Sequence, residues 1–186
     1  MTNYRITDFP ASTTAMLAGA CLVALLLAAC VSDVRARRIP NKLVALIALL
    51  GLAYSMTSLS LMEGAGRAFV GLALGFALWV PFYALGMLGA GDVKLFAAGC
   101  CWLAPSQVFG AALVSALAGG VLSVIALVLS HGAGLTAFRL AEVARDPTTL
   151  GTPLKAPPGR PTVPYGIALA VGLALAGWVP SLSRLT

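Results

Sequence analysis

Acidic side chains are scarce in this sequence, so each of them is a candidate for chemistry. The 186 residues contain only six Asp and Glu residues: Asp8, Asp33, Glu63, Asp92, Glu142 and Asp146. Asp33 and Asp92 stand out because Asp33 ends the first apolar stretch and Asp92 opens the unusually short fourth one, whereas the other four are expected in the N-terminal tail or in loops. An ionisable group in or near hydrocarbon is costly, so each is a functional hypothesis by default. The structural alternative for either residue alone is an interfacial ion pair with Arg or, for Asp92, a favourable helix N-terminus.

Two carboxylates that share a site of low dielectric constant cannot easily both ionise, so one keeps its proton. The ionised one can then activate water while the protonated one polarises a scissile carbonyl, as in aspartic proteases. Two glycines, Gly89 and Gly91, come just before Asp92. Glycine permits positive φ and close backbone approach, which a substrate strand or a second carboxyl requires. Lys94 lies two residues beyond Asp92, so on a helix it should point away from it and act as a snorkelling anchor.

Other catalytic groups find little support in the sequence. Two of the four cysteines, Cys21 and Cys30, fall in one apolar stretch, and the other two are adjacent. Neither pair has zinc-ligand spacing, and His131 is the single histidine. We therefore expect no metal or cofactor, and a Cys or Ser nucleophile lacks a plausible His partner.

The composition places these residues in a membrane protein. Hydrophobic residues make up 60% of the chain and charged residues 10%, whereas soluble domains are roughly 25% charged. The net charge of +6 would suggest a nucleic-acid partner in a soluble protein. In a membrane protein the distribution of Lys and Arg across the loops matters more, so we expect lipid and no nucleic acid.

The uncharged stretches predict an all-α fold, a polytopic transmembrane bundle forming a single domain over 1–186. Strands are disfavoured because the apolar runs do not alternate. A mobile cytoplasmic loop is expected over 132–162. The fourth helix rises only about 16 Å, which predicts a re-entrant element or a preceding segment below the membrane surface. The six predicted helices are 12–31, 43–60, 68–88, 93–104, 107–130 and 163–181.

Within the third predicted helix, Gly71 and Gly75 suit close helix packing, and Pro81 predicts a kink. Glu63 is expected in a short loop before that helix.

The cations predict the orientation. With six helices, nine of the twelve Lys and Arg residues fall on one side: Arg35, Arg37, Arg38, Lys42, Lys94, Arg139, Arg145, Lys155 and Arg160. The positive-inside rule places that side, together with Asp33 and Asp92, in the cytoplasm and both termini outside. A competing interpretation takes Leu27-Ala28-Ala29-Cys30 as a lipoprotein cleavage box. The cations that follow Asp33 oppose it, because they resist translocation.

Three segments together resemble one enzyme family. Gly89-Ala90-Gly91-Asp92-Val93-Lys94-Leu95 is similar to the G-x-G-D-x-K-L signature of type IV prepilin peptidases. Asp33 followed by Ile39-Pro40-Asn41 resembles the other signature of that family. The segment from Pro164-Tyr165-Gly166 to Gly172 resembles its proline-led final helix. Pro40-Asn41 is expected to start the second helix rather than to touch substrate.

The resemblance implies a membrane-embedded aspartic endopeptidase with Asp33 and Asp92 as catalytic residues. Such an enzyme removes the leader of prepilin-like proteins at the cytoplasmic face of the bacterial inner membrane, in pilus assembly and protein secretion. The small size resembles the compact branch that serves Flp/Tad-type pili. Larger members carry an N-terminal domain with paired C-x-x-C motifs and often methylate the new N-terminus. Nothing here matches that domain, so methyltransferase activity is not expected.

Two rival functions remain open at the level of sequence. A small proton-coupled transporter could also use two intramembrane carboxylates, although no convincing pair of repeated broken helices is present. A non-enzymatic assembly protein would tolerate replacement of either aspartate. The identity of the prepilin, the assignment of base and acid, and the oligomeric state are left open as well.

Overall fold

A computed structural model describes residues 13–129 and 165–176. Over these residues the chain forms six helices and no strand, which confirms the predicted all-helical bundle. The helices are α1 (Thr13–Ala36), α2 (Asn41–Ser58), α3 (Leu61–Ala84), α4 (Ala90–Cys100), α5 (Pro105–Leu129) and α7 (Tyr165–Ala176). The predicted loop 132–162, with His131, Glu142 and Asp146, lies outside the described residues.

Helices α1, α2, α3 and α5 form the part of the bundle that suits a bilayer. In the described part of the chain these four are long and apolar enough to cross a membrane. They also expose large apolar side chains, such as Leu17, Phe69 and Leu117, each more than 60% accessible. Side chains of this kind are stable when they face lipid. The chain is therefore a membrane protein.

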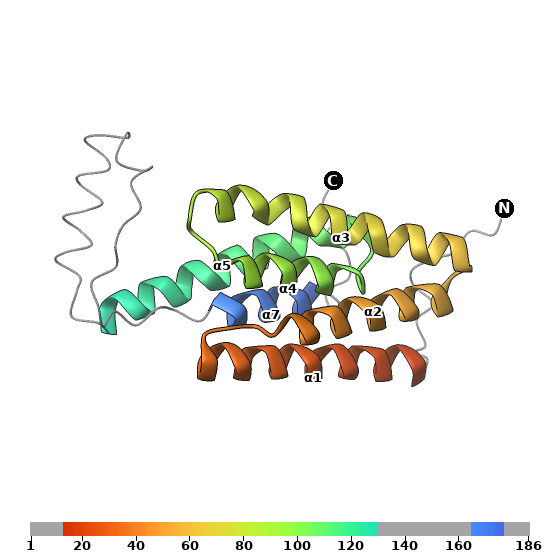
Figure 1. The fold of residues 1–186 in the computed structure, drawn as a ribbon, viewed down its shortest axis with the longest axis horizontal. Coiled ribbons are helices and arrows are strands. Elements are labelled where there is room, and N and C mark those ends of the chain that lie inside the picture. The colour runs from red at the N-terminus through yellow and green to blue at the C-terminus, as the bar shows by residue number, and fades with distance from the viewer. Residues whose placement is uncertain (1–12, 130–164, 177–186) are drawn as a thin grey trace.

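The short helix α4 forms the centre of the bundle. Seven of its 11 residues are buried, and Leu95 and Phe96 are fully inaccessible. Figure 1 shows α4 between α3 on one side and α2 and α7 on the other. A helix too short to span the bilayer is tolerated at this depth because protein surrounds it, rather than lipid. The bundle thus explains the unusual length that the sequence predicted for this helix.

Small residues allow α3 to pack closely on α4. A Cβ at Gly75 would lie 2.7 Å from the Cys100 sulfur, and one at Gly71 would meet the Cys100 carbonyl. The predicted packing role of this glycine pair is confirmed. An aromatic contact supports the same interface, because the rings of Trp79 and Phe96 pack edge to face with centroids 5.6 Å apart.

A tryptophan holds the far end of α4. In the turn after α4, the indole N–H of Trp102 donates to the Ile47 carbonyl on α2 at 2.9 Å, and the ring stacks on Tyr54. Trp102 is buried, so this hydrogen bond is shielded from competing donors and acceptors. The position of α4 along α2 is fixed by this contact.

Several helix ends differ from the prediction. The prediction ended helices near charged residues at the membrane boundary, whereas the observed helices continue past such residues. Helix α1 continues five residues beyond the predicted end, to Ala36, so Asp33 lies inside it. Helix α3 begins at Leu61 rather than at 68, with Ser60 as its N-cap, and Glu63 belongs to its first turn and not to a loop. Helix α3 includes Pro81 and ends at Ala84, four residues before the predicted end at 88. Helix α2 begins at Asn41, two residues before the predicted start at 43, which agrees with the expected role of Pro40-Asn41. Helix α4 spans Ala90–Cys100 rather than 93–104.

Successive helices run in opposite directions, so the turns that connect them lie at two ends of the bundle. Figure 1 shows the end of α1, the start of α2, the turn between α3 and α4, and the start of α7 at one end. The turn between α2 and α3 and the turn between α4 and α5 lie at the other. The C-terminal end of α1 and the N-terminal end of α4 therefore meet, and these ends carry the two aspartates.

Candidate active site

Asp33 lies in the last turn of α1, where the helix ends sharply. Arg37 ends the helix in the left-handed region, with φ 50°, and its N–H donates to the Asp33 carbonyl at 2.8 Å. This is a common way to close a helix, although it usually employs glycine. The Ser32 hydroxyl then donates to the Arg38 carbonyl at 2.9 Å and ties the turn to α1. The backbone around Asp33 is thus fixed on both sides.

The carboxylate of Asp33 contacts the first turn of α7. The Gly166 N–H donates to Asp33 Oδ2 at 3.1 Å. Gly166 is buried, and a Cβ at this position would lie only 2.8 Å from the same oxygen. The Asp33 carboxylate therefore occupies the space that a side chain would take at position 166. The first N–H groups of a helix have no partner within the helix, so a carboxylate is favoured there.

Asp92 lies in the first turn of α4 and is held by its own helix. The Gly89 N–H donates to Asp92 Oδ2 at 3.2 Å, which is the acidic half of a capping box. Gly89 leaves room for this arrangement, since a Cβ there would lie 3.1 Å from the same oxygen. Both aspartates therefore have one carboxylate oxygen fixed by a backbone N–H.

The two glycines before Asp92 do not act in the way that the sequence suggested. Gly89 has φ −78°, and among the described residues only Gly86 and Arg37 have positive φ. A Cβ at Gly91 would lie 3.6 Å from the Ile39 side chain, which is an ordinary van der Waals contact. The start of α4 thus lies beside the segment that follows Asp33, and this contact does not require a glycine. Neither glycine uses the positive φ that its residue type permits, and the approach is tight only at Gly89.

The two carboxyl groups interact electrostatically. Asp92 is partly buried and lies outside the four long apolar spans. Burial, and then the nearby charge of Asp33, raise the pKa of Asp92 to about 6, against the opposing effect of the Gly89 N–H. Both causes disfavour a second negative charge. The pair can thus hold one proton up to about pH 6, and this is the state that acid–base chemistry with two carboxyl groups requires.

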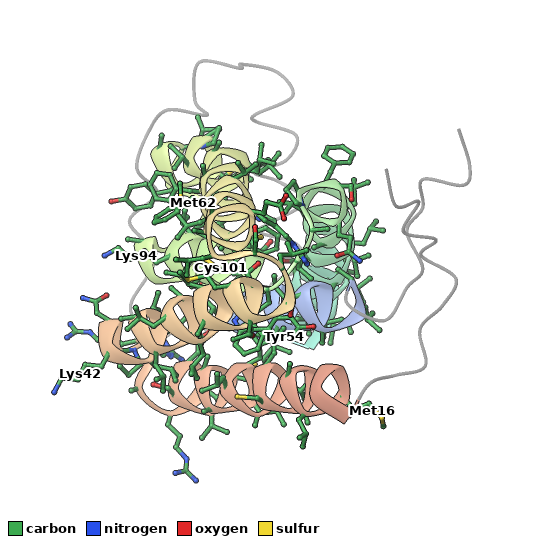
Figure 2. The ribbon with its side chains drawn as sticks, turned by 90° about the vertical axis from the view of Figure 1, so that its right-hand side faces the viewer. Met16, Lys42, Tyr54, Met62, Lys94 and Cys101 are labelled. Carbon is green, nitrogen blue, oxygen red and sulfur yellow. The ribbon has the colours of Figure 1, made fainter. Side chains whose placement is uncertain are left out.

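Lys94 does not join the two aspartates. It is exposed on α4, and Figure 2 shows Lys94 and Lys42 pointing outward from the same side of the bundle. The direction predicted for Lys94 agrees with this arrangement, and its role as an anchor stays a prediction. Arg35, Arg37 and Arg38 are exposed as well, so the surroundings of the site are basic.

Gly166 is the residue of the site that the sequence did not identify. Its carbonyl also accepts a hydrogen bond from the Cys30 thiol at 3.7 Å, so both sides of this residue contact α1. The available signal was a glycine in the first turn of the last predicted helix. Within residues 13–129 and 165–176, His, Cys, Asp and Glu side chains nowhere gather in a group that could hold a metal ion.

Comparison with known proteins adds one finding. The sequence model of a family described as the type IV leader peptidase family matches residues 20–124. The match includes both aspartates and the glycines before Asp92, and it ends before Gly166. Neither the curated proteins nor the solved structures gave a match.

Proposed function

Because the chain belongs to the type IV leader peptidase family and is therefore a peptidase, we propose that it is an aspartic endopeptidase that removes the leader of prepilin-like proteins. Asp33 and Asp92 are the proposed catalytic residues. The observation that carries this proposal is the interaction of the two carboxyl groups at one end of the bundle, where burial and mutual repulsion favour a single shared proton.

The proposed chemistry follows from that shared proton. The ionised carboxylate accepts a proton from a water molecule as the water oxygen attacks the carbonyl carbon of the scissile peptide bond. The protonated carboxyl donates its proton to the carbonyl oxygen and forms a tetrahedral intermediate. When the intermediate collapses, the C–N bond breaks and the leaving nitrogen takes up the proton first removed from water. The remaining hydroxyl proton returns to the pair and restores its starting state.

The proposed location is the bacterial inner membrane, with the catalytic end toward the cytoplasm. Exposed cations surround that end in the described residues, among them Arg35, Lys42 and Lys94. Such residues favour the cytoplasmic side. The proposed partners are a prepilin-like substrate and the lipid bilayer. Membership of the compact Flp/Tad-type branch stays a prediction.

Co-expression with a candidate prepilin tests the proposal. In a host that lacks any other prepilin peptidase, the wild-type protein should convert the prepilin into a shorter product that begins at the family's cleavage site. Asp33→Asn should leave the prepilin at full length at an equal level in the membrane. A transporter or a non-enzymatic assembly protein would leave the prepilin uncut in both cases, and that outcome would overturn the proposal.

A further inference from the structure

Helix α7 contacts the site in a manner that the mechanism above does not use. Its first turn meets α1 at two points, both on Gly166. The N–H donates to the Asp33 carboxylate, and the carbonyl accepts from the Cys30 thiol, one turn earlier in α1. Gly166 is thus the residue through which the start of α7 and the catalytic turn of α1 are joined.

Close packing on α5 fixes the position of α7. The Tyr165 ring lies against Gly119, where a Cβ would be 2.7 Å from the ring. Further along, a Cβ at Gly172 would meet the Ser115 hydroxyl and the Ala111 carbonyl. Contacts this close leave α7 little freedom to slide or rotate, because packed interiors do not deform continuously. The Gly166 N–H is therefore presented from a rigid support.

We propose that Gly166 is the positioning residue for Asp33: its N–H holds one carboxylate oxygen, and its lack of a side chain makes room for that oxygen. The inference rests on the proposed function. A carboxylate that is already oriented needs less reorganisation in the transition state.

Gly166→Ala tests the proposal, with Gly120→Ala as the matched control, because a Cβ at Gly120 meets nothing within 4 Å. Steady-state cleavage of a prepilin should be measured with purified protein in detergent. For Gly166→Ala, kcat should fall about tenfold to a hundredfold with little change in KM, since a displaced catalytic group loses alignment and not substrate binding. Gly120→Ala should match the wild type in both kcat and KM.

A second variant keeps the test informative if Gly166→Ala does not fold. Gly119→Ala pushes on the Tyr165 ring at the start of α7 without adding an atom beside Asp33, so it should lower kcat by a smaller factor, again with little change in KM. An unchanged kcat in folded Gly166→Ala, or in Gly119→Ala when the former is unfolded, would overturn the positioning role. Inactivity of Asp33→Asn alongside that result would leave the proposed function standing. Cleavage by Asp33→Asn would instead refute the proposed function itself.

Discussion

The two aspartates are oriented before any substrate arrives. Asp33 Oδ2 is held by α7 and Asp92 Oδ2 by the start of α4, through N–H groups that the helices would otherwise leave unpaired. A backbone donor cannot change rotamer, so it fixes a carboxylate at little additional cost in entropy. This arrangement points to two residues acting as one unit, and that property can be measured.

We expect Asp33→Asn and Asp92→Asn each to abolish prepilin cleavage, with activity reduced by at least about 10⁴-fold. Asn matches Asp in shape and can still accept the backbone N–H, but it cannot carry the proton that the reaction moves. The double variant should be barely worse than either single variant, because the second change removes nothing that still works. Initial rates in the same detergent would show this, with Glu63→Gln as the control for losing an acidic group. Independent, multiplying losses would argue against a catalytic pair.

The raised pKa of Asp92 predicts that Asp92→Asn, which lowers activity, increases stability. Its pKa is about 6 in the folded protein against an ordinary value of 3.8. The folded state therefore binds more protons than the unfolded state between these values, and the free energy of unfolding falls as pH rises through that window. Asp92→Asn removes this loss, so it should melt at a higher temperature than the wild type above pH 6. The gain is at most about 3 kcal/mol, and smaller because the side chain is only partly buried.

Thermal unfolding in detergent between pH 4 and 8 measures the difference. The two proteins should converge toward pH 4, where the wild-type carboxyl is protonated in the folded state and close to its ordinary pKa of 3.8 in the unfolded state. Glu63→Gln should show no such pH-dependent gain. An Asp92→Asn protein that is less stable than the wild type at pH 8 would contradict the assigned cost of ionisation.

Residue types revealed the aspartates, but their partners depend on tertiary structure. Asp33 and Asp92 could be predicted because charged residues are rare and costly in such a chain. Gly166 could not be predicted, because the sequence does not show which residue will accept a hydrogen bond from an N–H group in the first turn of a helix. Of the two glycines before Asp92, only Gly89 makes a tight approach, where a Cβ would lie 3.1 Å from the Asp92 carboxylate. Neither glycine has positive φ. Glycine can serve through its small size or through its conformational freedom, and the sequence does not distinguish the two.

At the scale of elements, glycine contacts decide where the helices lie. Helix α3 approaches α4 through Gly71 and Gly75, and α7 approaches α5 through Gly172. The small-residue spacing on α3 could be recognised in the sequence, because both glycines lie on one helix face. The sequence did not show which helix packs against these glycines, and it did not locate several helix ends. Charges mark where a chain leaves hydrocarbon, whereas hydrogen bonding continues α1 beyond Asp33 to Ala36.

The α3–α4 contact predicts a loss of stability without a change in charge. In Gly75→Val the new side chain would overlap the Cys100 sulfur and press on the backbone of Ala97, at 2.7 and 3.2 Å for the Cβ alone. Overpacking of this kind costs about 1–3 kcal/mol. Thermal unfolding in detergent should show the loss, and cleavage should fall as α4 shifts. Gly66→Ala, on the open side of α3 where a Cβ meets nothing within 4 Å, should melt like the wild type.

At the scale of the whole molecule, three helix ends meet to form the site. The end of α1 supplies Asp33, the start of α4 supplies Asp92, and the start of α7 supplies the Gly166 N–H. These residues lie far apart in the sequence, but they meet because an even number of the described helices separates the end of α1 from each of the two helix starts: α2 and α3 before α4, and α2 to α5 before α7. The same alternation predicts which loops face which side of the membrane.

Single cysteines can test that orientation in a variant whose four native cysteines are replaced. Lys42 and Met62 are both exposed and both labelled in Figure 2. Lys42 lies at the start of α2 and Met62 at the start of α3, just after the other end of α2, so they mark the two sides of the bundle. Lys42→Cys should react with an impermeant thiol reagent in inside-out vesicles and not in intact spheroplasts, because the cations at the catalytic end favour the cytoplasm. Met62→Cys should show the reverse pattern. Labelling of Lys42→Cys in intact spheroplasts would place the aspartates outside and would invert the proposed topology, and a cytoplasmic prepilin leader could then not reach them.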